Sequence, residues 1–272
     1  MSHYQLIAFD MDGTLLDSSK RILPSSLRAI DRAVKADKAV VVSTGRNPRE
    51  IDVFDDQLSS VRYRISCSGA LVYDRQENQS IFAVPIPDET VQEIFRRFHD
   101  LDVCIHILSY ESVFQKDKLD NIQEYHMEAY GPLFHQICVL TDNIEQKWHA
   151  EHFPAFKLNI YSRTPEAREK HLVLLKDLPV QCVYSESTAL ELSAACISKA
   201  AGLEALCQHL KIPIEDTIAV GDADNDMVIL SAAGMGIAMG NAIPRVLSAA
   251  DAVVADNDHD GCAEAIDRWL LK

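Results

Sequence analysis

Residues 6–14 read Leu-Ile-Ala-Phe-Asp-Met-Asp-Gly-Thr, an apolar run that ends in two aspartates. Side chains alternate along an extended segment, so Asp10 and Asp12 point to one side of it, and Gly13 lets the chain turn away without a Cβ clash. Two carboxylates beside one pocket favour phosphoryl-transfer chemistry. Taken alone, the stretch is equally typical of an Asp-rich strand-to-loop turn without a catalytic role.

Further short apolar runs resemble this first strand, and they occupy residues 39–42, 218–220, 236–239 and 252–254. Continuous apolar strands are typical of parallel sheets that are covered on both faces. Helical periodicity separates them, at residues 24–35, 198–210, 226–233 and 262–271. The pattern predicts a doubly wound α/β fold, in which the carboxyl ends of the strands bring Asp10, Thr44 and Asp222 to one crevice.

The middle of the chain differs in composition and predicts an inserted α+β domain. From about residue 82 to 187 it carries most of the aromatic residues, with helices expected from Asp88 and Thr164 and strands at 103–108, 112–115, 136–140 and 156–161. We therefore expect a core formed by residues 1–84 and 188–272, and an inserted domain over residues 85–187 that hinges near residues 84–87 and 185–188.

Composition excludes several classes of partner. The 272 residues include 41 acidic and 26 basic side chains, and the net charge of −15 disfavours nucleic acids and anionic membranes as partners. We expect a cytoplasmic protein, because no apolar stretch has the length of a membrane span and the N-terminus does not resemble a signal peptide. We also expect a monomer or a weak homodimer. The seven scattered cysteines are most simply buried free thiols.

Two later segments carry groups that suit a phosphate and a metal ion. Thr44-Gly45-Arg46 follows the second strand and offers a hydroxyl, a backbone N–H and a guanidinium, although a polar turn with a surface arginine has the same letters. Residues 221–226 read Gly-Asp-Ala-Asp-Asn-Asp at the end of another strand. Crowded carboxylates of this kind suit Mg²⁺, while an Asx-rich helix cap accounts for only one or two of them.

The ordered motifs, together with Lys199 at the start of a helix, resemble those of the haloacid dehalogenase superfamily. The sequence is most similar to the Cof-type sugar-phosphate phosphatases, in which an α/β cap lies between the second and third motifs. Residues 234–242 and Asp260-Gly261 are also similar to that branch. The resemblance covers residues 4–81 and 188–272, and the cap is matched by size and pattern only.

The resemblance implies a Mg²⁺-dependent phosphatase of small phosphorylated metabolites. Asp10 would be the nucleophile that forms an aspartyl phosphate, and Asp12 the general acid and base. The remaining implied roles are phosphate binding by the residues Thr44, Gly45, Arg46, Lys199 and Asn225, and metal binding by Asp10, Asp12, Asp222 and Asp226, with Asp226 either ligating the metal or orienting a bound water.

The same motifs admit other functions. A phosphomutase or phosphotransferase would use the same intermediate and pass it to another hydroxyl, and a metabolite-binding regulator would keep the fold without turnover. The substrate is left open by the sequence, with sugar phosphates, flavin-pathway phosphates and pyridoxal phosphate as the candidates. Cap aromatics such as Tyr130 and Trp148 either stack on a substrate or form the cap's own core.

Overall fold

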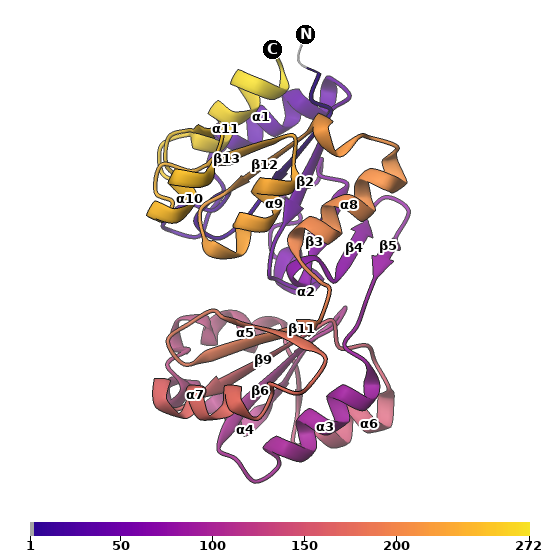
Figure 1. Ribbon diagram of the computed structural model, residues 1–272, viewed down its shortest axis with the longest axis vertical. Helices are drawn as coiled ribbons and strands as arrows, with labels where there is room; N and C mark the ends of the chain where they lie inside the picture. The colour runs from indigo at the N-terminus through magenta and orange to yellow at the C-terminus, as the bar shows by residue number, and fades with distance from the viewer. Residues whose placement is uncertain (1–2) are drawn as a thin grey trace. The chain divides into compact units, whose positions relative to one another are not determined.

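The computed structural model describes residues 3–272, which divide into two compact units (Figure 1). The core unit comprises residues 3–45, Phe54–Ala83 and Ser198–Lys272. The cap unit comprises Arg46–Val53 and Val84–Ile197. None of the helices in the described part of the chain has the length and hydropathy needed to cross a bilayer.

The core unit is built on an eight-stranded sheet, and its strand order confirms the doubly wound α/β fold. In spatial order the strands are β14 (Ala252–Val253), β13 (Met235–Ala238), β12 (Thr217–Gly221), β1 (Leu6–Phe9), β2 (Ala39–Ser43), β3 (Tyr63–Ser66), β4 (Leu71–Asp74) and β5 (Gln79–Ala83). Neighbours from β14 to β3 are parallel, and β4 and β5 add an antiparallel edge. Strand β1 is central, so residues just after it meet those that follow β2 and β12.

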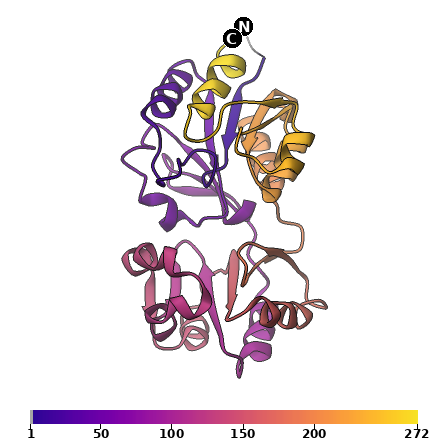
Figure 2. The same ribbon diagram turned by 90° about the vertical axis from the view of Figure 1, so that its left-hand side faces the viewer.

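Helices cover both faces of this sheet (Figures 1 and 2). One face carries α1 (Pro24–Lys35), α11 (Gly261–Ala265) and the π-helical turn Ile266–Leu270, and the other carries α8 (Lys199–Leu210), α9 (Met227–Ala232) and α10 (Pro244–Ala249). Helix α1 buries Ala29, Ile30 and Ala33 along one stripe, as its periodicity predicts. Because both faces are covered, β1 is buried along its whole length.

The cap unit has its own six-stranded sheet, which confirms an inserted α+β domain. Its strands in spatial order are β10 (Val180–Tyr184), β11 (Ala189–Ala194), β9 (Lys157–Ser162), β6 (Val103–Leu108), β7 (Ser112–Gln115) and β8 (Val139–Thr141). The unit's helices are α2 (Pro48–Asp52), α3 (Asp88–Phe98), α4 (Lys116–Asp120), α5 (Gly131–Ile137), α6 (Ile144–Glu151) and α7 (Pro165–Val173). Short 3₁₀ turns connect several of these elements.

The boundaries of the cap unit in the structure differ from those predicted from the sequence. We expected the insertion to end at residue 187, but β11 hydrogen-bonds to β9 and β10 within the cap sheet, and the unit ends at Ile197. The segment Arg46–Val53, expected in the core, also belongs to the cap unit. The strand expected at residues 136–140 is instead the end of α5 followed by β8.

Candidate active site

Asp10 stands directly after β1, at the carboxyl edge of the core sheet. Its backbone N–H donates to the Val220 carbonyl of β12 at 3.0 Å, which continues the ladder by one residue past the strand. The residue is buried, with 6% of its surface exposed. The apolar strand therefore delivers one carboxylate to a site from which bulk water is largely excluded.

Lys199 reaches this carboxylate from the start of α8. The helix is capped by Ser198, whose hydroxyl accepts from the N–H of Ala201 at 3.2 Å. Gly69, with φ +103°, makes this placement possible, because a Cβ there would lie 1.9 Å from the carbonyl oxygen of Ser198. The ammonium lies 2.6 Å from Asp10 Oδ1 and 2.6 Å from Asp226 Oδ1, and Lys199 is only 2% exposed.

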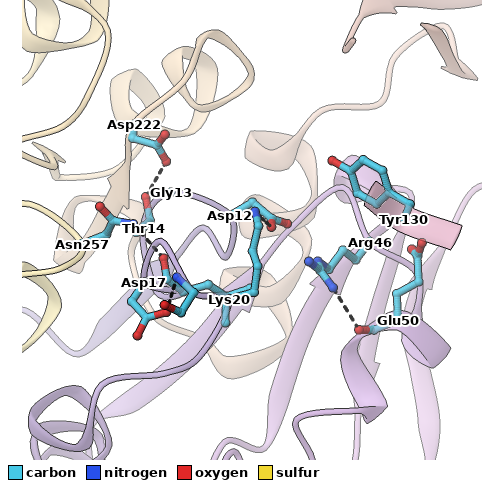
Figure 3. Close-up of polar contacts among 12 residues, drawn as sticks. Asp12, Gly13, Thr14, Asp17, Lys20, Arg46, Glu50, Tyr130, Asp222 and Asn257 are labelled. Carbon is cyan, nitrogen blue, oxygen red and sulfur yellow. Dashed lines mark hydrogen bonds and ion pairs between the residues drawn. The ribbon is translucent and has the colours of Figure 1, made fainter. Parts of the chain in front are cut away.

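The turn after β12 supplies the other two carboxylates. Asp226 is fully buried, and its Oδ2 accepts from the backbone N–H groups of Asp222 at 3.0 Å and Ala223 at 3.1 Å. Asp222 Oδ1 accepts from the Thr14 hydroxyl at 2.7 Å (Figure 3). Gly13, with φ +82°, is required here as well, since a Cβ would lie 2.4 Å from Asp222 Oδ2.

The three aspartates form a cluster that fits a hard cation. One oxygen from each of Asp10, Asp222 and Asp226 lies within 4.8 Å of the others. Burial is the main cause that raises the pKa of Asp10 to about 7; Lys199 opposes the rise, and Asp226 and Asp222 add to it. Burial likewise raises the pKa of Asp222 to about 6. Crowded carboxylates whose ionised form is disfavoured are the oxygen donors that Mg²⁺ would stabilise.

Lys199 offsets part of this negative charge. Burial alone would lower the pKa of its ammonium, but Asp10 and Asp226 outweigh burial and raise it, so the lysine stays charged. One ammonium does not neutralise three ionised carboxylates, and a bound divalent cation would neutralise the remaining negative charge. The donor set of the described residues therefore fits Mg²⁺.

Asp12 faces a different environment from Asp10. Its carboxylate is 40% exposed and lies 2.8 Å from the Lys20 ammonium (Figure 3). The loop that carries it is tied down from the far end of the chain: Asn241 Nδ2 donates to the Gly13 carbonyl at 2.8 Å, and Asn257 Nδ2 donates to the Leu16 carbonyl at 2.9 Å. Asp12 is thus an accessible carboxyl group on a fixed loop.

The other residues predicted for the site take varied positions. Thr44 is buried just past β2, where its N–H donates to Ile65 and its carbonyl accepts from Ser68. Gly45 is the last residue of this core segment, and Arg46 belongs to the cap unit, where its Nη1 donates to the Glu50 carbonyl at 3.4 Å (Figure 3). Asn225 is exposed in the 3₁₀ turn Asp224–Asp226.

Sequence reasoning missed several residues that shape the site. Lys20 pairs with Asp12, and Asn257 anchors the motif loop, yet neither stands in a motif. Asn241, which lies within the glycine-rich stretch 234–242, also holds the loop through the Gly13 carbonyl. The Ser43 hydroxyl, one residue before Thr44, is buried without a hydrogen-bond partner among the described residues. The sequence indicates this hydroxyl only through its position, because Ser43 and Thr44 directly follow the apolar run at residues 39–42.

Comparisons with known proteins agree with this geometry. The family model for haloacid dehalogenase-like hydrolases matches residues 7–266. The HMP-PP phosphatase of Serratia proteamaculans is 26% identical over 273 residues, which cover 98% of this chain and 96% of that protein. The pyridoxal phosphate phosphatase of Escherichia coli is 28% identical over 280 residues, covering 98% and 99%. A haloacid dehalogenase-like hydrolase from Bacteroides thetaiotaomicron superposes with a TM-score of 0.86 at 26% identity, covering 97% and 99%.

Proposed function

Because the chain belongs to the haloacid dehalogenase-like hydrolases, we propose that it is a Mg²⁺-dependent phosphatase of small phosphorylated metabolites. The observation that carries this proposal is the buried group in which Lys199 joins Asp10 and Asp226. A buried lysine held between two carboxylates costs desolvation energy, which structural stability alone rarely justifies. A cation fixed in this way suits a phosphoryl group, whose negative charge is distributed over its oxygens.

Asp10 is the nucleophile in this proposal. Its Oδ2 is the oxygen not held by Lys199, and it attacks phosphorus while the bond between phosphorus and the ester oxygen breaks. The departing alkoxide takes a proton from Asp12, which then accepts one from the water that hydrolyses the aspartyl phosphate. Inorganic phosphate leaves, and both aspartates return to their starting states.

Asp12 suits proton transfer because of where it lies. Its partly exposed carboxyl group exchanges protons with solvent, and Lys20 holds it in one orientation through a contact that is weak enough to break. Thr44, Gly45, Arg46 and Asn225 are the further groups proposed to bind the phosphoryl oxygens.

Mg²⁺ would be held by the side chains of Asp10 and Asp222 and by the Asp12 carbonyl, and it would neutralise charge on the transferring phosphoryl group. Asp226 is better suited to orientation than to ligation, because Oδ1 is bound to Lys199 and Oδ2 to two backbone N–H groups. We propose that it fixes both the lysine and the Asp222 turn.

Phosphate release from p-nitrophenyl phosphate tests the proposal. With Mg²⁺ we expect turnover that EDTA abolishes and added Mg²⁺ restores, and Asp10→Asn should lower it by several orders of magnitude. Asp224→Asn is the matched control, since Asp224 belongs to the same acidic turn but is exposed. Equal activity of Asp10→Asn and the unmodified protein would refute the assignment, and transfer of the phosphoryl group to a second sugar without phosphate release would favour a mutase.

A further inference from the structure

The Ser43 hydroxyl is a buried polar group that no hydrogen bond satisfies. Ser43 is the last residue of β2 and is 1% exposed, and its Oγ has no hydrogen-bond partner among the described residues. A hydroxyl of this kind lowers the stability of the fold, because water satisfies it in the unfolded chain. The common reasons for keeping one are a catalytic role or a bound water.

The register of the core sheet places Ser43 beside Asp10. Phe9 of β1 is paired with Val42 of β2, so the next residues along the two parallel strands, Asp10 and Ser43, are lateral neighbours. Adjacent strands lie about 4.8 Å apart, which brings two such side chains within reach of each other when they point to the same side of the sheet.

Both side chains point toward α8. Ala8 and Val41 belong to the same hydrophobic cluster as Leu203 of α8. Side chains alternate along a strand, so Asp10 and Ser43, which follow two residues later, face the same side. The ion pair between Asp10 and the first residue of α8 agrees with this direction.

The neighbours of Ser43 on its other sides are apolar. In β3 it is paired with Ile65, which is fully buried in the same cluster. Gly202 of α8 packs closely over this position, since a Cβ on it would lie 2.6 Å from Ile65 Cγ2. Asp10 is therefore the polar side chain that flanks Ser43 within the sheet.

In the structure the Asp10 carboxylate is bound by Lys199 instead. The Lys199 ammonium lies 2.6 Å from Asp10 Oδ1, a charge-assisted hydrogen bond that holds the carboxylate in place. A second donor on this carboxylate would reduce the negative charge available for attack. An unpaired Ser43 hydroxyl is therefore compatible with an Asp10 that is ready to react.

Phosphorylation would change the partners of Asp10. When Oδ2 forms a bond to phosphorus, the carboxyl group loses its negative charge and Oδ1 becomes a neutral carbonyl oxygen. The Lys199 ammonium is then attracted more strongly by the charged phosphoryl oxygens than by Oδ1. Rotation about the Cα–Cβ bond of Ser43, the one staggered torsion of a serine side chain, redirects its hydroxyl at low cost.

We infer that the Ser43 hydroxyl donates a hydrogen bond to the Asp10 carbonyl oxygen of the aspartyl phosphate and accelerates its hydrolysis. In that step the water oxygen bonds to phosphorus, the bond from phosphorus to Oδ2 breaks, its electron pair passes to the carboxyl group, and Asp12 takes the proton from the water. Negative charge returns to the carboxyl oxygens, so a donor on Oδ1 binds more strongly in the transition state than in the intermediate. This inference rests on the proposed phosphatase function.

Rapid-quench kinetics with p-nitrophenyl phosphate and Mg²⁺ measure the two steps separately. Release of p-nitrophenol reports formation of the aspartyl phosphate, and release of phosphate reports its hydrolysis. In Ser43→Ala we expect formation to be unchanged and hydrolysis to slow about tenfold, the effect of one lost hydrogen bond. Borohydride reduces an aspartyl phosphate to homoserine, and it should therefore trap more homoserine at position 10 in this variant than in the unmodified protein.

Stability distinguishes this role from a structural one. Ser43→Ala removes a buried hydroxyl that has no partner, so the free energy of unfolding should rise or stay the same. Ser66→Ala is the matched control, because Ser66 ends the adjacent strand β3 and its buried hydroxyl donates to the Leu71 carbonyl at 3.2 Å. The control variant should lose stability and leave the rate of hydrolysis unchanged.

Ser43→Cys gives a graded test, since a thiol is a weaker hydrogen-bond donor than a hydroxyl. Its rate of hydrolysis should lie between those of the unmodified protein and Ser43→Ala. Equal rates of hydrolysis in the unmodified protein and Ser43→Ala, or a loss of stability in Ser43→Ala, would overturn the inference alone. Turnover without homoserine at position 10 in any of these proteins would refute the proposed function itself, and the inference with it.

Discussion

Replacing Lys199 by Met removes the cation that joins the buried carboxylates while keeping a side chain of similar length. Lys199 makes two charge-assisted hydrogen bonds, each 2.6 Å long, to Asp10 and Asp226. Such bonds contribute about 1.5–3 kcal/mol each, and breaking a buried ion pair costs about 3–5 kcal/mol. Both the two lost hydrogen bonds and the broken ion pair therefore predict that the free energy of unfolding of the core unit falls by about 4 kcal/mol.

Amide hydrogen exchange followed by mass spectrometry measures this loss in each unit separately. In EDTA at neutral pH, protection of β1 and β12 should fall by about a thousandfold, the equivalent of about 4 kcal/mol. Peptides from β9 in the cap unit serve as the internal control and should keep their protection. Lys35→Met is the matched variant, because Lys35 is an exposed lysine at the end of α1 in the same unit.

A double variant tests whether the cost is electrostatic. If uncompensated carboxylates cause the loss, adding Asp226→Asn to Lys199→Met should cost less than Asp226→Asn does in the unmodified protein. Protection of β1 and β12 within about fivefold of the unmodified protein in Lys199→Met would refute the reasoning. So would strictly additive effects of the two substitutions.

Three further outcomes follow from the geometry. Gly13→Ala should lower Mg²⁺ affinity measured by calorimetry, because the new Cβ would meet Asp222 Oδ2 at 2.4 Å and φ is +82°; unchanged affinity would contradict the packing described. Asp222→Ala should weaken Mg²⁺ binding more than Asp12→Ala, since Asp12 is proposed to ligate through its carbonyl, and the opposite order would refute that division. His106 is neutral when buried and its pKa falls from 6.5 to about 3, so the folded state binds fewer protons than the unfolded state between these values. The cap unit should therefore lose stability as pH drops from 6.5 towards 4, and urea unfolding of His106→Gln should show a smaller dependence on pH over that window.

The core fold was predictable because its strands are buried on both faces. The composition of apolar runs such as Leu6–Phe9 indicates strands that are buried on both faces. The polar residues that follow these runs indicate the carboxyl edge of the sheet. Helical periodicity at residues 198–210 placed Lys199 near the start of a helix, and the family resemblance then indicated its role. The clustering of Asp10, Asp222 and Asp226 then follows from strand order.

The contacts that stabilise the motif loop were not predictable. Asn241 and Asn257 donate to main-chain carbonyls more than 200 residues away. Every residue has a main-chain carbonyl, so the sequence does not indicate which of them accepts a hydrogen bond. We placed the end of the cap unit before β11, whose sequence Ala-Leu-Glu-Leu-Ser-Ala does not indicate which of the two sheets it joins. Its partners β9 and β10 are set by antiparallel register, which short-range patterns do not specify.

Identification of the phosphorylated residue tests the central proposal most directly. The protein is mixed with a phosphomonoester and Mg²⁺, quenched within milliseconds, and treated with borohydride, which reduces an acyl phosphate of aspartate to homoserine. Peptide mass spectrometry should then find homoserine at position 10, and only when substrate was present. Turnover with the label on another residue, or with an intact Asp10 in every quenched sample, would contradict the account.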